Sequence, residues 1–187
     1  MKTSIRFLVG TTASVIALTA LSQTPGAPYV PTPTAIVDRM LTLARVGPGD
    51  YVVDLGSGDG RLVTTAVAKY KARGGMGVEL DGKLVKEANE NAARAGVADR
   101  VKFVEGDLFK ADVRDATVVT LYLLPGMLGD VEDKLAKELK PGTRVISHDY
   151  PLPSWKHVDI VAFDTAEKVP ISGTTRTVLL LYRVPSK

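Results

Sequence analysis

Three acidic residues stand where short apolar runs of the sequence end. Asp54 and Glu79 close two of these runs, and Asp107 follows a third. If the runs are parallel strands of one sheet, their carboxyl ends meet along one edge, which is where open α/β sheets bind ligands. Carboxylates at that edge accept hydrogen bonds from amines and hydroxyls, attract cations and repel phosphates. The pattern therefore predicts a site for a ligand that carries a cationic amine and hydroxyl groups.

A glycine-rich turn surrounds the first of these acids. Segment 54–61 reads Asp-Leu-Gly-Ser-Gly-Asp-Gly-Arg, and Gly56, Gly58 and Gly60 let the backbone approach a ligand where larger side chains would collide. A purely structural turn or a nicotinamide dinucleotide site would use the same glycines. However, Asp54 would repel a pyrophosphate and attract the amine and sulfonium of S-adenosylmethionine. The segment therefore favours S-adenosylmethionine as the cofactor.

The two later acids fit the rest of that cofactor. Glu79 is placed to accept both ribose hydroxyls through its two oxygens, with a solvated strand end as the alternative. Asp107 is placed to accept the adenine amino group, with Leu108 or Phe109 against the ring; an N-cap for the following turn is its alternative. Three acids at consecutive strand ends agree with one bound ligand, and this agreement outweighs each separate alternative.

Strand and helix patterns alternate along most of the chain. The expected helices have apolar residues at helical spacing, and the expected strands are short apolar or β-branched runs. Thr34 is a candidate cap for the first helix. The strands are 51–55, 76–80, 101–105, 117–124 and 143–147, and the helices are 35–44, 61–70, 82–95 and 128–139. This alternation predicts an α/β domain with a mostly parallel, Rossmann-like sheet, right-handed crossovers and helices on both faces. Two last strands, 158–163 and 176–184, with only a loop between them, predict a terminal antiparallel hairpin.

The N-terminus has the composition of an export signal. Lys2 and Arg6 precede the apolar and small residues 7–21, and small residues then suit cleavage before Gln23. Residues 1–22 are therefore interpreted as a signal peptide, which predicts an exported protein of the periplasm or another extracytoplasmic space. The alternative is a membrane anchor formed by residues 7–21, although that stretch is shorter than the about 20 residues of a spanning helix. Either interpretation places the domain outside the cytoplasm, and the anchor would keep it near the membrane.

A proline-rich segment, 23–33, separates this leader from the domain 34–187. It has four prolines between residues 24 and 33, so it should be extended rather than helical. On composition alone it is a linker. We find no internal repeat and no second domain in the sequence.

Composition argues against two classes of function. The chain has no cysteine and two histidines, which excludes disulfides and thiolate metal sites and leaves little for a histidine metal centre, so we expect no metal. The formal net charge is +3, but without residues 1–22 the count is 22 Lys and Arg against 21 Asp and Glu, because Lys2 and Arg6 are lost from 24. A near balance of charge gives no electrostatic footprint for nucleic acid.

The cofactor motifs resemble those of class I, seven-β-strand methyltransferases. More narrowly, the chain is similar to the mitochondrial lysine methyltransferases that modify the ATP synthase c-subunit and the adenine nucleotide translocase, and to their prokaryotic relatives, over about residues 28–155. The superfamily motifs are segment 54–61, Gly77-Val-Glu-Leu and Gly106-Asp-Leu; the narrower ones are Pro28-Tyr-Val-Pro-Thr, Asp59-Gly-Arg and Pro151-Leu-Pro-Ser-Trp.

This resemblance implies the strand order 3-2-1-4-5-7-6 and a cover over the cofactor formed by Tyr29 and its neighbouring prolines. It also implies that segment 54–61 contacts the cofactor through several residues beyond Asp54. They are Gly56, Ser57, Gly58, Asp59 and Arg61.

The acceptor is inferred from the resemblance and from one departure. Tyr122-Leu-Leu-Pro-Gly lacks the Asn-Pro-Pro-Tyr of many amide and nucleobase methylators, which argues against amide or adenine acceptors. The resemblance implies N-methylation of a protein lysine or another amine, which must lose its proton because its free pKa is about 10.4. Tyr122, His148 and Asp149 are the catalytic candidates, since each lies at or near the carboxyl end of a strand beside the pocket. Alternatively, His148 is a packed strand-end residue and Asp149 caps the turn at Pro151.

The sequence thus predicts an S-adenosylmethionine-dependent methyltransferase. The alternative of another class is an exported protein that binds or scaffolds an S-adenosyl ligand without turnover, and an oxidoreductase on the same fold ranks third. The oligomeric state stays open.

Overall fold

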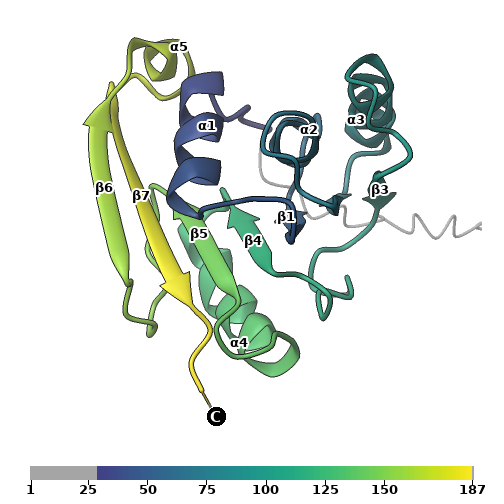
Figure 1. Cartoon of the computed structure of the whole chain (residues 1–187). Coiled ribbons are helices and arrows are strands. Elements are labelled where there is room, and N and C mark those ends of the chain that lie inside the picture. Colours follow the sequence, from purple (N-terminus) through teal and green to yellow (C-terminus); the bar gives the residue numbers. More distant parts are fainter. Residues whose placement is uncertain (1–28, 187) are drawn as a thin grey trace, which may run out of the picture.

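The computed structural model describes residues 29–186 and shows a seven-stranded sheet between layers of helices (Figure 1). The predicted leader, 1–22, and residues 23–28 of the proline-rich segment lie outside the described residues. The strands are β1 (Tyr51–Leu55), β2 (Gly74–Glu79), β3 (Val101–Glu105), β4 (Val118–Leu121), β5 (Arg144–His148), β6 (Asp159–Asp164) and β7 (Arg176–Arg183). The helices are α1 (Thr34–Leu43), α2 (Arg61–Ala68), α3 (Gly82–Arg94) and α4 (Leu128–Glu138), with short turns of helix at η1 (Pro125–Met127), η2 (Ala166–Lys168) and α5 (Val169–Ser172).

The strand order is β3-β2-β1-β4-β5-β7-β6, as the resemblance implies. The first five strands of this order are parallel, and β7 runs antiparallel to both β5 and β6, which confirms the predicted terminal hairpin. In the β1 register, Asp54 lies opposite Gly77 of β2 and Thr120 of β4. The carboxyl ends of these central strands therefore meet at one edge of the sheet, where the acidic residues were expected.

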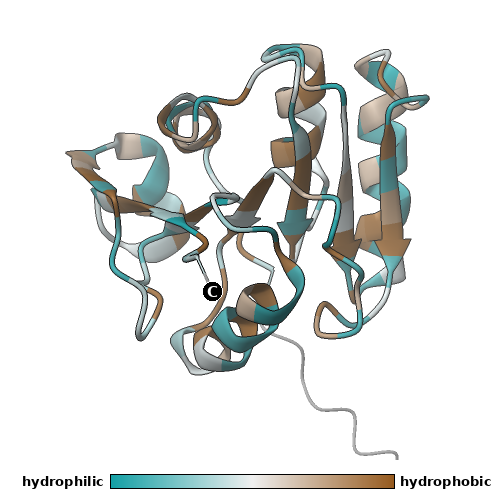
Figure 2. Cartoon of the chain, turned by 60° about the horizontal axis from the view of Figure 1, so that its bottom comes forward, coloured by the Kyte–Doolittle hydropathy of each residue, from teal (hydrophilic) through white to brown (hydrophobic). Residues whose placement is uncertain are grey.

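Two hydrophobic cores lie on opposite faces of the sheet, because successive strand residues point to opposite sides. Val52 faces the core under α1, α2 and α3, whereas Val53 faces the core under α4. The strands are hydrophobic over most of their length, and the helices alternate polar and apolar bands, as Figure 2 shows. β1 and β4 are buried on both faces, which explains why their sequences are continuous apolar runs.

Several predicted boundaries shift. The helix expected over 61–70 ends at Ala68, and the strand expected over 117–124 ends at Leu121, because Leu124 leads into η1 with Pro125 at its start. Thr34 was expected to cap α1, but it is the first helical residue and Pro33 holds the N-cap position without a side-chain hydrogen bond. Proline before a helix already fixes a suitable backbone angle and needs no donor there.

The connection between β6 and β7 also differs from the expectation of a plain loop. It contains η2 and α5, with Pro170 in the first turn of α5 and Gly173, at φ 72°, ending it. This short helical insertion brings Lys168 into the protein, where the residue is 3% exposed. Among residues 29–186, no helix is long and apolar enough to cross a membrane.

Candidate active site

The glycine-rich turn after β1 is pinned to the neighbouring strand. The backbone amides of Gly56 and Ser57 both donate to the Val78 carbonyl oxygen, at 2.9 and 3.0 Å. Gly56, Gly58 and Gly60 all have positive φ, between 52° and 83°. Larger residues rarely adopt this conformation, so the sequence uses glycine where the turn wraps around the end of β1.

Asp54 is a buried carboxyl at the head of this turn. Its Oδ1 accepts a hydrogen bond of 2.6 Å from Thr120 Oγ1 on β4. Burial raises the pKa of Asp54 to about 7, against the lowering effect of the Thr120 hydrogen bond, and the negative charges of Glu79 and Asp59 add to the rise. A carboxyl at this pKa is about half ionised at neutral pH, and a cationic ligand amine beside it would favour the ionised form.

Glu79 holds the turn through its carboxylate. Its Oε2 accepts from the Gly58 amide at 2.9 Å, while Oε1 accepts from the amides of Leu80 and Asp81 at 2.8 and 3.0 Å. A carboxylate offers roughly four acceptor positions, so one position on Oε2 remains for a ligand hydroxyl. Binding both ribose hydroxyls would require one of these amide hydrogen bonds to be shared or released.

Asp107 follows β3, where an adenine contact was predicted, and it also caps the following turn, which was the alternative interpretation. Its Oδ1 accepts from the Phe109 amide at 2.9 Å, which is the turn-capping contact, and Lys110 Nζ lies 3.8 Å from Oδ2. Leu108 packs against the core under α4, and Phe109 is exposed. The carboxylate keeps acceptor capacity on Oδ2, so capping the turn and meeting an adenine amino group are compatible roles.

Tyr29 lies over the glycine-rich turn; the cover over the cofactor that the resemblance implies stays a prediction. A Cβ atom added to Gly58 would fall 2.3 Å from Tyr29 Cε2, so the ring packs directly on this glycine. Burial and the charge of Asp59 raise the pKa of the Tyr29 hydroxyl. Glycine at position 58 is therefore required both by its φ of 52° and by the ring above it.

Asp59 and Arg61 form an ion pair that fastens the same segment. Arg61 donates from Nε and Nη2 to the two Asp59 oxygens at 2.8 and 2.6 Å, and its Nη1 donates to the Thr32 carbonyl at 3.0 Å. Asn91 of α3 donates to the Asp59 carbonyl at 2.8 Å. Both predicted cofactor residues thus hold residues 29–33 against the turn, and any cofactor contact would be additional.

Ser57 points away from the expected ligand. A Cβ atom added to Gly77 would fall 2.5 Å from Ser57 Oγ, which places the hydroxyl beneath the turn against β2. This hydroxyl is buried and has no hydrogen-bond partner within residues 29–186. The Ser57 amide already donates to Val78, so a cofactor contact of Ser57 would use its backbone carbonyl, which accepts from the Gly60 amide at 2.9 Å and keeps a second acceptor position.

The three catalytic candidates meet at the ends of β4 and β5. The rings of Tyr122 and His148 are stacked, with centroids 4.0 Å apart and planes at 30°. His148 is fully buried, and neither ring nitrogen has a hydrogen-bond partner within the described part of the chain. Burial lowers the pKa of His148 to about 4, with the charge of Lys168 acting in the same direction and that of Asp149 opposing it. His148 is therefore neutral at physiological pH, as a packed strand-end residue would be.

Asp149 is engaged by a residue that the sequence analysis missed. Lys168 Nζ lies 2.5 Å from Asp149 Oδ2 and also donates to the Arg176 carbonyl. Asp149 Oδ1 accepts from the Val178 amide at 3.1 Å, and the residue adopts an unusual φ of 64°. No spacing pattern pairs Lys168 with Asp149, because the connection between β6 and β7 alone brings them together.

Tyr122 follows β4, the strand that pairs with β1. It follows Thr120, the partner of Asp54, by two residues, and the next residue, Leu123, packs on Gly56: a Cβ atom added there would fall 3.0 Å from Leu123 Cδ2. Burial, together with the charges of Asp149 and Tyr150, raises the pKa of Tyr122 to about 12. Its hydroxyl therefore stays protonated, and it can donate or accept a hydrogen bond near a bound amine.

The later motif Pro151-Leu-Pro-Ser-Trp serves the second core. Glu132 of α4 is buried and accepts from the amides of Ser154 and Trp155 at 3.0 and 3.3 Å, and Trp155 packs against the core under α4. The Leu152 amide donates to Tyr182 Oη at 3.0 Å. This motif therefore fixes the chain after β5 rather than lining the cofactor turn.

The strand order, the glycine-rich turn and the acids at the ends of β1 and β2 define a class I methyltransferase that uses S-adenosylmethionine. The family model described as the ANTKMT methyltransferase domain matches residues 54–159, and the chain belongs to this family. The matched range runs from Asp54 to the first residue of β6 and so includes the whole cofactor turn.

Relatives and solved structures agree with this assignment. The chain is 42% identical over 141 residues to a protein-lysine N-methyltransferase of Saccharolobus islandicus, covering 75% of this chain and 88% of the relative. It is 43% identical over 138 residues to the adenine nucleotide translocase lysine N-methyltransferase of Mus musculus, covering 74% of this chain and 59% of that protein. A structure described as an RNA methyltransferase from Salinibacter ruber, in complex with S-adenosyl-L-homocysteine, is 45% identical with a TM-score of 0.75, covering 84% of this chain and 95% of that one.

Proposed function

We propose that the chain methylates the side-chain amine of a protein lysine. The observation that carries this proposal is the 42% identity to a protein-lysine N-methyltransferase across 88% of that relative's length. The residues after β4 agree, because Tyr122-Leu-Leu-Pro offers an aromatic ring and apolar side chains in place of the amide-binding Asn-Pro-Pro-Tyr.

In this proposal, one set of residues binds the cofactor and Tyr122 positions the acceptor amine. When bound, S-adenosylmethionine supplies a methyl group to the lysine nitrogen lone pair, and the electron pair of the broken carbon–sulfur bond stays on sulfur. We propose that Asp54 meets the cofactor amine, Glu79 a ribose hydroxyl and Asp107 the adenine. Tyr122 would border the acceptor amine, whose proton must leave to water before attack. Such transfer depends mainly on orientation and exclusion of water, so no strong base is required.

Asp149 and His148 fit a supporting role better than direct catalysis. Asp149 is neutralised by Lys168, and His148 is buried, neutral and stacked on Tyr122. We propose that both fix the Tyr122 ring from behind. A neutral histidine would also avoid repelling a cationic lysine that approaches the site.

An RNA acceptor is the second candidate, because the 45% identical structure is described as an RNA methyltransferase. Residues 29–186 carry 21 Lys and Arg, since Lys2, Arg6 and Lys187 of the total of 24 lie outside them, against all 21 Asp and Glu. A balanced charge is unfavourable for strong phosphate-backbone binding, which favours the lysine.

Methyl-labelled S-adenosylmethionine separates these two acceptors. The purified protein is incubated with an extract of its own cells, and the protein and RNA fractions are counted and analysed by mass spectrometry. We expect label on lysine side chains, and none with the Gly58→Val variant. Label confined to RNA, or to residues other than lysine, would contradict the proposal.

We also propose that residues 1–22 are removed on export, leaving the segment 23–33 joined to the domain 34–187. The charged start and apolar stretch of the leader support this. Mass spectrometry of the protein isolated from its own cells should find an N-terminal peptide that begins at Gln23. A peptide that begins at Met1 would leave the leader as an anchor or an uncleaved segment.

A further inference from the structure

A cavity of about 470 Å³ lies at the edge of the sheet opposite the cofactor turn. It is bordered by the residues that precede β2, β4 and β5 and by the end of β7, since Arg144 and Arg183 face each other across the antiparallel pair. β1 has five residues, so the two edges are about 16 Å apart at roughly 3.3 Å per residue. A ligand here would not reach the methyl-transfer site.

The lining of this cavity is strongly basic. Asp115 is the acidic residue among its lining side chains. The basic ones are Arg45, Arg73, Lys140, Arg144 and Arg183. Five of the 21 basic residues in 29–186 therefore gather here with one of the 21 acidic residues, although the described chain is neutral as a whole. Like charges gathered in a concave site repel one another and create a local positive potential that attracts anions.

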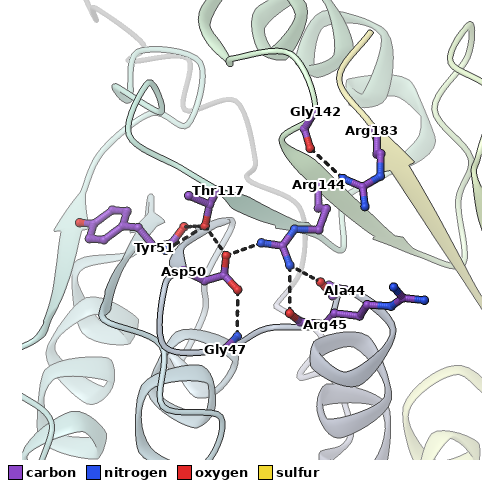
Figure 3. A network of polar contacts seen from close by, with 9 residues as sticks. All are labelled: Ala44, Arg45, Gly47, Asp50, Tyr51, Thr117, Gly142, Arg144 and Arg183. Carbon is purple, nitrogen blue, oxygen red and sulfur yellow. Dashed lines mark hydrogen bonds and ion pairs between the residues drawn. The ribbon is translucent and has the colours of Figure 1, made fainter.

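Arg144 lines the cavity, and its guanidinium is already hydrogen-bonded within the protein (Figure 3). Its guanidinium donates to Asp50 and to the carbonyls of Ala44 and Arg45 at the end of α1. Asp50 also accepts from the Gly47 amide at 2.8 Å and from Thr117 Oγ1 at 2.7 Å. Asp50 thus accepts three hydrogen bonds within the protein, and among residues 29–186 its ion pair is with Arg144 and with none of the other basic side chains of the cavity.

The remaining basic side chains keep most of their donors. No ion pair joins Arg45, Arg73, Lys140 or Arg183 to an acidic residue within the described range 29–186. Arg183 donates once, from Nη1 to the Gly142 carbonyl at 3.2 Å, so its other donors are available (Figure 3). All four are exposed, and they come from four separate segments around one cavity.

We propose that this cavity binds a small anion that carries phosphate groups, such as pyrophosphate or a nucleoside di- or triphosphate. Guanidinium forks match the geometry of phosphate oxygens and bind them through paired, charge-assisted hydrogen bonds. The volume lies within the roughly 300–1,000 Å³ of small-molecule sites, and a concave shape suits a compact anion better than an extended polymer. This site is separate from the methyl-transfer site and does not depend on the acceptor proposed above.

Calorimetric titration with inorganic pyrophosphate at low ionic strength tests the proposal. We compare the wild type with the double variant Arg45→Glu/Lys140→Glu and with Lys102→Glu, a charge reversal on β3 that does not line the cavity. The wild type should bind about one pyrophosphate, the double variant at least tenfold more weakly, and Lys102→Glu within about twofold of the wild type. S-adenosylmethionine affinity should be unchanged in all three, which shows that each variant is folded.

Two results would overturn this assignment. The first is no saturable binding of pyrophosphate to the wild type, or equal weakening by the double variant and by Lys102→Glu. The second comes from sedimentation with phosphatidylcholine vesicles, with and without phosphatidylglycerol, and from titration with single-stranded RNA. If the wild type binds the RNA or the phosphatidylglycerol vesicles but not pyrophosphate, the basic residues belong to a surface for a macromolecule or a membrane instead.

Discussion

The carboxylates of Asp54 and Glu79 form hydrogen bonds within the protein before any ligand is bound. Asp54 accepts from Thr120, and Glu79 accepts from three backbone amides that include Gly58 of the turn. Such contacts fix the glycine-rich turn in advance, so less ordering remains to be done when a ligand binds. Substituting either acid should therefore affect both the turn and the ligand.

Glu79→Ala should weaken S-adenosylmethionine binding by about 1–3 kcal/mol, because it leaves a ligand hydroxyl and the Gly58 amide without their charged acceptor. Calorimetry of the variant and the wild type measures this change, and circular dichroism checks the fold. Glu90→Ala is the matched control, since Glu90 lies exposed on α3. Unchanged affinity in a folded Glu79→Ala protein would remove Glu79 from the cofactor site.

Asp54 predicts a pH dependence of stability in the cofactor-free protein. Its pKa is raised from 3.8 to about 7 on folding, so the folded state holds this proton more tightly than the unfolded state. The stability it contributes is complete below about pH 4 and is lost as the pH rises towards 7. From pH 5 to pH 8, the free energy of unfolding of the wild type should fall by about 2–3 kcal/mol relative to Asp54→Asn.

Urea denaturation of the two proteins at both pH values measures this difference. His148 has a lowered pKa and acts with the opposite sign between about pH 4 and 6.5, but it is present in both proteins and cancels. A stability difference between wild type and Asp54→Asn that is the same at pH 5 and pH 8 would show that Asp54 titrates normally.

The part of the candidate site that lies at the carboxyl ends of the strands could be predicted from the sequence. Asp54, Glu79 and Asp107 could be placed because parallel strands bring their carboxyl ends together. The engagement of Asp149 by Lys168 could not be foreseen, because it depends on how the connection between β6 and β7 folds. Likewise, the inward orientation of Ser57 could not be foreseen, because it depends on the absence of a side chain at Gly77 on the neighbouring strand β2.

At the scale of elements, residues 29–33 precede α1 in the chain but form contacts with the start of α2 and with the glycine-rich turn. Arg61 holds the Thr32 carbonyl, Asp59 holds Arg61, and Tyr29 packs on Gly58. Prolines in this segment reduce the entropy lost on ordering it. The segment is therefore built as a fixed cover over the turn.

Tyr29→Ala should weaken S-adenosylmethionine binding roughly two- to tenfold, the effect of losing one packed aromatic ring, and should lower the rate of methyl transfer. Deletion of 23–32 should do the same more severely and leave a folded domain. Tyr29→Phe keeps the ring and should stay close to the wild type. Wild-type affinity and rate in both Tyr29→Ala and the deletion would make the segment a passive spacer.

The ion pair of Lys168 with Asp149 joins the insertion between β6 and β7 to the end of β5. Lys168→Met should destabilise the protein by about 3–5 kcal/mol, because it leaves a largely buried carboxylate without its partner. Adding Asp149→Asn should recover much of this loss, since the unpaired charge is then removed. Denaturation of the three proteins measures both effects, and an equal stability of the single and double variants would argue against the pair.

The order of elements was largely predictable, and their exact ends were not. Alternating apolar runs and helical patterns located the strands and the longer helices, and the resemblance supplied the order of the sheet. The strand expected over 117–124 stops at Leu121 because the chain must leave the sheet before Pro125. The helical turns at 166–172 were missed because a seven-residue segment shows too little periodicity.

For the molecule as a whole, one sheet separates two cores and carries the cofactor site at one of its edges. Both cores pack on the same central strands, so loss of either should unfold the other. Unfolding is then expected to be one cooperative transition, and a ligand that binds only the folded state raises the free energy of unfolding by mass action.

Gly58→Val should separate folding from this ligand effect. S-adenosylmethionine at about 100 times its Kd should stabilise the wild type by about 2.7 kcal/mol. Gly58→Val should remove that gain, because valine at a φ of 52° collides with the Tyr29 ring at the turn, and should cost about 1–2 kcal/mol in backbone strain. The matched control is Gly96→Val after α3, where φ is 68° but no atom lies within 4 Å of the added Cβ. Gly96→Val should carry a similar backbone strain and keep the full stabilisation by S-adenosylmethionine. Thermal denaturation of each protein with and without the cofactor measures both effects. If the cofactor still stabilises Gly58→Val as much as the wild type, the ligand does not bind at this turn.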